Sequence, residues 1–202
     1  MYALIEDNSI SKLITNPKSM VIGDVRYPAK IFQLWSQDEL NALGIYEVIT
    51  DLTNFKDEAY YINTNEQYNF ADGQVTRSWG NATAKELEDR NATDEDGVEL
   101  NPIVVIEGLK TEKKKIVKAQ ASTLLERTDW HNHKALDDDT YTIPDNIKTY
   151  RANVRAKSNE MENQIDACTT VEELETLYTY VNTGTEKNPV IERPLAEFPK
   201  EI

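Results

Sequence analysis

Hydrophobic positions in the second half of the chain recur every three or four residues, a spacing typical of amphipathic helices. Pro144 followed by Asp145 is a helix start signal, and a long apolar face follows it, made of Ile147, Tyr150, Val154, Met161, Ile165 and Cys168. An earlier apolar stripe ends near Thr128 and Asp129, and it contains Ile116, Val117, Ala121, Leu124 and Leu125. The pattern predicts an α-helical hairpin, and Trp130 is expected to be a buried apolar plug at the elbow between its helices.

Two capping boxes predict further helices, because a Ser or Thr followed three residues later by Glu satisfies free backbone N–H groups at a helix start. Ser36 and Glu39 form the first, which opens a short helix that Gly44 ends. Thr170 opens the second, before a helix that Gly184 ends. Its inner face is expected to contain Val171, Leu174, Leu177, Tyr178 and Val181.

The first eighty residues contain short β-type runs separated by turn residues. Two runs around residues 7–9 predict a hairpin, and Asp72-Gly73 predicts another. Further strands are expected at residues 20–22, 45–49, 59–62, 68–70 and 75–79. The region is predicted to be a β-meander with one solvated face and one short helix.

The composition changes after residue 83. Residues 86–99 contain seven acidic residues and one basic residue, which predicts an exposed linker. Asp94 to Gly97 suggests a calcium loop, but Ala92 and Ile103 stand at its first and twelfth ligand positions, so no calcium site is expected. Residues 103–106 predict one more strand, paired either with the first domain or with a neighbouring subunit.

The predicted fold class is therefore α+β. A small β-rich domain with one short helix covers residues 1–83, and an acidic linker covers residues 84–102. A helical hairpin domain covers residues 103–184, and residues 185–202 form an extended tail.

A formal net charge of −14 argues against binding to nucleic acid or to anionic lipid. Five lysines lie between Lys110 and Lys118. We expect them to form the solvent face of a helix, and the alternative is a docking patch for an acidic partner or for the acidic linker. One cysteine cannot form an intrachain disulfide, and no apolar run approaches the roughly 20 residues that span a bilayer. These features predict a soluble protein that is made in the cytoplasm.

No sequence motif indicates an active site. His131 and His133 lack the partners of a zinc motif and are expected in a loop, and the acidic run at 137–139 lacks further ligands at loop spacing. There is no glycine-rich phosphate loop and no Gly-x-Ser-x-Gly motif. We expect no enzymatic activity, no cofactor and no metal site.

The order LL-x-x-TDW … IP-x-x-x-x-x-YR-x-x-VR resembles the C-terminal element of bacteriophage tail-fibre assembly chaperones and other tail-associated phage proteins. Two other segments, Gly23 to Pro28 with Gly44 to Tyr46 and Arg193 to Pro199, resemble virion proteins of marine phages. The sequence departs from these patterns at His131, His133, Ala196 and Phe198. The residues that match the first pattern are Leu124, Leu125, Thr128, Asp129, Trp130, Ile143, Pro144, Tyr150, Arg151 and Arg155.

The resemblance implies a structural protein of the phage tail, in a fibre, baseplate or fibre attachment. Its partners would be other tail or fibre proteins and further copies of the chain, and its location the virion. The alternative is a tail-fibre assembly chaperone that is absent from the mature virion.

The C-terminal segment of this chain, residues 185–202, is expected to dock on a partner. Prolines 189, 194 and 199 reduce the entropy that an extended segment loses on binding, and Arg193 and Glu197 are expected to pair across the contact. The alternative is that the tail packs back on the helical hairpin. The expected partner-binding residues are Trp130, Tyr150, Arg151, Val190, Arg193, Leu195 and Phe198.

Overall fold

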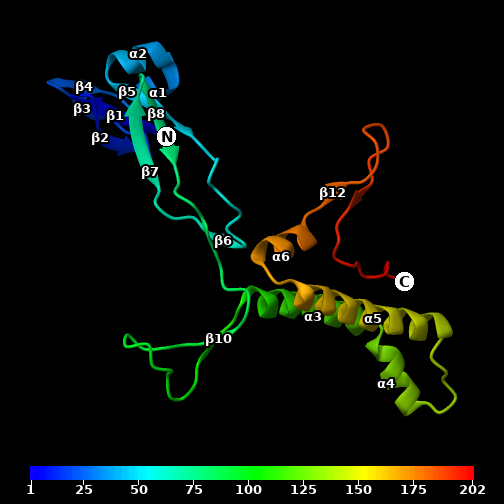
Figure 1. The fold of residues 1–202 in the computed structure, drawn as a ribbon. Helices are drawn as coiled ribbons and strands as arrows, with labels where there is room; N and C mark the ends of the chain where they lie inside the picture. Colours follow the sequence, from blue (N-terminus) through cyan, green and yellow to red (C-terminus); the bar gives the residue numbers. More distant parts are fainter. The chain divides into compact units, whose positions relative to one another are not determined.

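The computed structural model describes all 202 residues and divides into two compact units, residues 1–84 and 85–202. Strands dominate the first unit and helices dominate the second (Figure 1), so the chain is an α+β protein as predicted. The division lies one residue beyond the expected end of the β-rich domain.

A five-stranded sheet forms the first unit, in the order β2 (Ser9–Ile14), β1 (Tyr2–Glu6), β5 (Ile45–Thr50), β8 (Gln74–Ser78) and β7 (Gln67–Ala71). Neighbouring strands are antiparallel except β5 and β8, which are parallel. The expected β-meander is therefore wrong. A meander joins neighbours by short turns, whereas a parallel pair requires a long crossover, here the segment between β5 and β8.

Both predicted hairpins are present. Asp7 and Asn8 have positive φ in the β1–β2 turn, and Asp72 and Gly73 have positive φ between β7 and β8. Positive φ at both central residues suits the twist of a two-residue hairpin, which explains why Asp, Asn and Gly stand there.

Two short helices, α1 (Ile31–Leu34) and α2 (Gln37–Ala42), precede β5, where one was expected. The Ser36–Glu39 capping box at the start of α2 is confirmed. Gly44 follows α2 with a φ of 77°, and a Cβ there would lie 2.6 Å from the carbonyl oxygen of Ile5. Only glycine therefore fits between α2 and β1.

The remaining strands of this unit form two small antiparallel pairs. β3 (Met20–Ile22) pairs with β4 (Val25–Tyr27), and β6 (Tyr61–Ile62) pairs with β9 (Thr83–Ala84). The expected strand at residues 59–62 is thus reduced to its last two residues. One core cluster contains Leu4, Ile14, Ile31, Leu40 and Ile45, and a second contains Ala3, Val48 and Val75.

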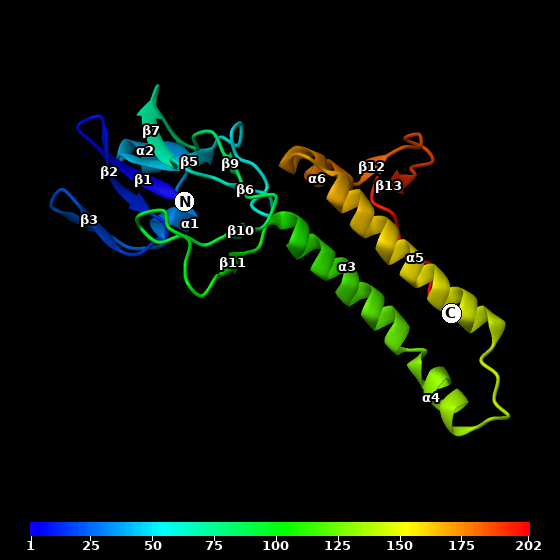
Figure 2. The same ribbon diagram turned by 60° about the horizontal axis from the view of Figure 1, so that its bottom comes forward.

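Helices α3 (Leu109–Glu126) and α5 (Asp145–Ala167) lie side by side in the second unit (Figures 1 and 2), which confirms the predicted hairpin. Every position of the expected α5 face is buried, from Ile147 to Cys168. On α3, Val117 and Ala121 are buried, but Ile116 is half exposed. No helix of the structure combines the length and the apolar character needed to cross a membrane.

Between these two helices the chain forms α4 (Asp129–Asp137), not the loop that was expected. After α5, α6 (Val171–Tyr178) begins with the predicted Thr170–Glu173 capping box, but it ends well before Gly184. The chain then forms a small hairpin of β12 (Val181–Asn182) and β13 (Ile191–Glu192), so Val181 is exposed and not on the inner face of a helix.

Candidate interaction site

Arg151 is the centre of the helical elbow. Its guanidinium, which is almost fully buried, donates hydrogen bonds to the carbonyl oxygen of Leu125 (2.8 Å) and to Oγ1 of Thr128 (2.7 Å), and it pairs with Oδ1 of Asp129 at 2.7 Å. The last carbonyls of a helix have no partner within the helix, and a cation there also interacts favourably with the negative end of the helix dipole. Arg151 of α5 therefore closes the C-terminal end of α3.

Tyr150 lies on the inner side of the same turn of α5. It is buried and packs with Ala121 of α3 and Val154 of α5. The structure thus brings together five of the residues that carry the resemblance, Leu125, Thr128, Asp129, Tyr150 and Arg151. Tyr150 and Arg151 are nevertheless buried inside the chain, which corrects their expected role in contacting a partner.

Trp130 is not the buried plug that the sequence predicted, since 54% of it is exposed. The chain continues as a helix beyond Thr128, and in this helix it is His131 that points inward. The imidazole of His131 is buried, its Nδ1 hydrogen-bonds with the hydroxyl of Tyr141, and the Trp130 ring stacks on it with 3.7 Å between ring centroids. Trp130 therefore has one ring face covered and the rest of its surface available.

The C-terminal tail packs back on the helices of its own unit. Leu195 is 2% exposed, and its N–H donates to the carbonyl oxygen of Leu177 in α6 (3.0 Å). The amide of Gln164 in α5 donates to the carbonyl of Pro194 (3.1 Å) and accepts from the N–H of Ala196 (2.8 Å). The short extended segment Pro194–Ala196 is therefore hydrogen-bonded to α6 through Leu195 and to α5 through its other two residues.

Beyond that segment, Phe198 packs against the cluster formed by Ala121, Tyr150 and Val154, and Glu201 forms an ion pair with Arg127 of α3. Arg193 and Glu197 pair with each other at 3.7 Å, not with a partner. The expectation that Arg193, Leu195 and Phe198 form a free docking arm is therefore wrong, and the alternative, a strap on the helical hairpin, describes them. Val190 alone among the expected tail contacts is largely exposed.

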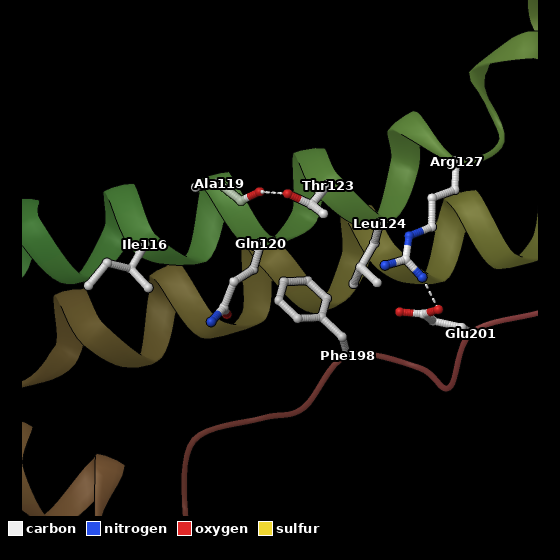
Figure 3. Close-up of a pocket in the computed structure, with 8 residues that line it drawn as sticks. All are labelled: Ile116, Ala119, Gln120, Thr123, Leu124, Arg127, Phe198 and Glu201. Carbon is white, nitrogen blue, oxygen red and sulfur yellow. Dashed lines mark hydrogen bonds and ion pairs between the residues drawn. The ribbon is translucent and has the colours of Figure 1, made fainter.

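A shallow groove of about 480 Å³ lies between α3 and the end of the tail. Figure 3 shows Phe198 on one side of it and Leu124 and Gln120 on the other, with the Arg127–Glu201 ion pair at one end. The walls are mainly apolar. Its remaining lining residues are Ile116, Ala119 and Thr123.

Residues 85–108, which contain nearly all of the linker expected at residues 84–102, fold back on themselves at the N-terminal end of α3. The N–H groups of Leu109 and Lys110 donate to the carbonyls of Glu86 (3.0 Å) and Leu87 (3.1 Å). Asp89 accepts from the N–H of Gly108 at 2.8 Å. The preceding chain thus supplies partners for the free N–H groups at the start of α3.

Beyond this anchor, β10 (Arg90–Asn91) pairs antiparallel with β11 (Val105–Ile106). The strand expected at residues 103–106 is thus shortened to its last two residues, and it pairs with Arg90 and Asn91 and not with the first domain. We call residues 90–106 the arm; it extends from the N-terminal end of α3 and not along the helices (Figures 1 and 2). Its large aliphatic side chains are all exposed: Val98, Leu100, Ile103, Val104, Val105 and Ile106.

The lysines of α3 are mostly paired with carboxylates of their own unit. Lys110 binds Glu88 and the carbonyl of Asp166, and Lys114 binds the carboxylate of Asp166 at 2.7 Å. Further ion pairs join Lys115 to Glu107 and Lys118 to Glu162. Lys110 thus pairs with the acidic segment, as one alternative held, whereas Lys114 and Lys118 pair with α5. Lys115 and Lys118 also remain exposed, as expected for the solvent face of a helix.

The perturbed titratable groups have structural partners. The N–H of Ser36 lowers the pKa of Glu39, and the N–H of Thr169 lowers the pKa of Glu173. Burial raises the pKa of the Cys168 thiol, which disfavours the reactive thiolate. The structure contains no group of three or more His, Cys, Asp or Glu side chains placed to hold a metal ion.

The exposed arm, the open ring surface of Trp130 and the groove beside Phe198 are therefore the surfaces of the second unit best suited to contact a partner. Sequence reasoning named Trp130 and Phe198 among the expected partner-binding residues, although it also expected Trp130 to be a buried plug and Phe198 to lie on a free tail. It predicted a strand at residues 103–106 but missed the pairing of this run with Arg90 and Asn91, because the acidic composition of residues 84–102 was taken to mean a linker. No protein-family model, curated protein or solved structure matches this chain.

Proposed function

We propose that the chain is a non-enzymatic structural protein of a bacteriophage tail, acting through protein–protein contacts in a fibre, a baseplate or a fibre attachment. The phage setting rests on the sequence resemblance at the elbow and at the two ends of the chain. The mode of action rests on one structural observation, the uncovered aliphatic arm.

The end of the arm, from Ile103 to Ile106, is as apolar as a strand in a protein core, but no other part of its unit covers it. Strand β11 comprises Val105 and Ile106, whose side chains lie on opposite faces of the strand, and Ile103 and Val104 directly precede it. Strands that are apolar on both faces are normally covered on both. Here all four side chains are exposed, and Ile103 reaches 63%.

A two-stranded hairpin is marginally stable in water by itself, and exposed aliphatic groups gathered in one place mark interaction sites. A protein that works by assembly makes use of such a segment. Hydrogen bonds within helix caps and a turn lower the pKa of three carboxyl groups, those of Glu39, Asp51 and Glu173, which gives these groups a structural role.

Mass spectrometry of purified phage particles tests this function. The expected result is that peptides from both units are present in washed particles, in a constant ratio to a known tail protein. If the chain is abundant in infected cells, co-purifies with an unassembled fibre and is missing from particles, the assembly-chaperone alternative replaces the proposal.

A further inference from the structure

The charges of the arm and of one region of the first unit are equal and opposite. The arm, residues 90–106, contains Arg90 and four carboxylates, Asp94, Glu95, Asp96 and Glu99, and so has a net charge of −3. Residues 12–30, which we call the basic region, contain Lys12, Lys18, Arg26 and Lys30 and a single carboxylate, Asp24. Its net charge is +3 in a chain whose total is −14.

The four cations of the basic region are exposed, and none of them forms an ion pair within its unit. They contrast with the lysines of α3, most of which have carboxylate partners. Lys12 and Lys18 line the same hollow of about 220 Å³, between the end of β2 and β3.

The basic region also has uncovered aliphatic groups. In the β3–β4 pair, Val21 lies opposite Arg26, and both are exposed, whereas Met20 and Ile22 pack on the core. Val25 is half exposed near the turn. A two-stranded pair has free N–H and C=O groups along its outer edges, which can accept another strand.

The arm is the chemical complement of this surface. It combines aliphatic side chains with carboxylates and has open strand edges of its own, while the basic region combines aliphatic side chains with cations. Opposite potentials on two apolar patches favour their encounter and fix their register.

We propose that the arm docks on the basic region of a second copy of this chain. The two surfaces differ, so the contact is heterologous, and repeating it joins copies head to tail into a ring or an open chain. Ions screen the charged part of the contact, so association weakens with salt.

Reciprocal charge reversal in the full-length protein tests the contact. E95K/D96K changes the arm from −3 to +1, and K18E/R26E changes the basic region from +3 to −1. Each variant alone then has like charges on its two surfaces, whereas an equimolar mixture restores opposite charges at both kinds of contact. The matched control, K187E/K200E, reverses two exposed cations outside both surfaces.

Multi-angle light scattering and sedimentation velocity at tens of micromolar protein measure the result, with circular dichroism to check folding. Wild type and control should form the same oligomer. Each reversal variant should dissociate, with an apparent Kd raised by about tenfold or more. The mixture should recover the oligomer. An I103T/V105T variant, which keeps the charges, should also weaken association.

A monomeric wild type at these concentrations overturns the proposal, since it shows that a different partner, or the chain's own first unit, covers the arm. An oligomer that survives both reversals also overturns it. The result is independent of the phage setting, because the particle measurement can fail while the self-association holds.

Discussion

The role of each residue at the elbow depends on whether its side chain is buried or exposed. Arg151 is inside and Trp130 is outside, although both belong to the same recognisable pattern. The distinction decides which substitutions affect folding and which affect binding.

Replacing Arg151 with Met should lower the free energy of unfolding by about 2–4 kcal/mol, because two hydrogen bonds from a charged donor are lost and the end of α3 loses its partner. The share from Asp129 is small, since that side chain is 45% exposed. Chemical denaturation measures the change. Arg155→Met, one helical turn along α5 at an exposed side chain, is the control and should change stability by less than about 0.5 kcal/mol.

Replacing Trp130 with Ala should cost only about 1 kcal/mol, the value of an aromatic stacking contact. A buried tryptophan, as expected from the sequence, would cost about 3–5 kcal/mol. Thermal unfolding compared with His131→Ala separates the two, since the buried His131 should be the more costly loss. A large loss for Trp130→Ala alone would mean that Trp130 is the plug after all.

At the scale of the elements, contacts with helices fix two segments in place. These are the C-terminal tail and the base of the arm, by which we mean residues 86–89 and their contacts at the start of α3. Each of these segments contains little regular secondary structure, so its sequence alone predicts a segment that is not attached to the helices. Each is instead held by backbone hydrogen bonds to a helix of the second unit, Leu195 to α6 and Glu86 to α3.

Truncation after Asn182 should lower the melting temperature of the second unit by several degrees, because it removes Leu195 and Phe198 from the helices. Leu195→Ala should reproduce much of this loss, at about 2–5 kcal/mol for a fully buried leucine. Val190→Ala, in the exposed hairpin, is the control. If truncation leaves the melting temperature unchanged and abolishes assembly instead, residues 185–202 bind a partner and do not stabilise the helices.

Asp89 should make the base of the arm sensitive to acid. The N–H of Gly108, then the hydroxyl of Thr111, lower its pKa in the folded chain. A lowered folded pKa stabilises the fold above the unfolded value of about 3.9, and this contribution is lost as the pH falls through the folded pKa.

Asp89→Asn should therefore be less stable than wild type at neutral pH, and the difference should shrink below about pH 4. Urea denaturation across this range measures it. Glu95→Gln, whose carboxylate forms no hydrogen bond, is the control and should give a difference that does not change with pH.

At the scale of the whole molecule, the chain contains two units with separate cores. Ile165→Ala removes a fully buried side chain from α5 and should cost the second unit about 2–5 kcal/mol. Hydrogen exchange read peptide by peptide should show faster exchange in α3 and α5, while β1, β5 and β8 keep their protection. Equal acceleration in both units would show that they unfold together.

Local sequence patterns were sufficient to predict several elements of this fold. Capping boxes at Ser36 and Thr170, the Asp72-Gly73 turn and the apolar face of α5 all lie within a few residues of the structure that they specify. Their physical causes, backbone hydrogen bonds, φ preference and helical periodicity, operate at that range.

The other features depend on partners that are distant in sequence, so they become apparent only in the packed fold. The parallel pairing of β5 with β8 joins segments separated by a long crossover. The burial of Arg151 depends on the carbonyl of Leu125, and that of Leu195 depends on α6. The acidic segment forms a β-arm and not a linker, because Lys110 and the first N–H groups of α3 hold its base. Such contacts have no periodicity along the chain, so the packed fold was needed to reveal them.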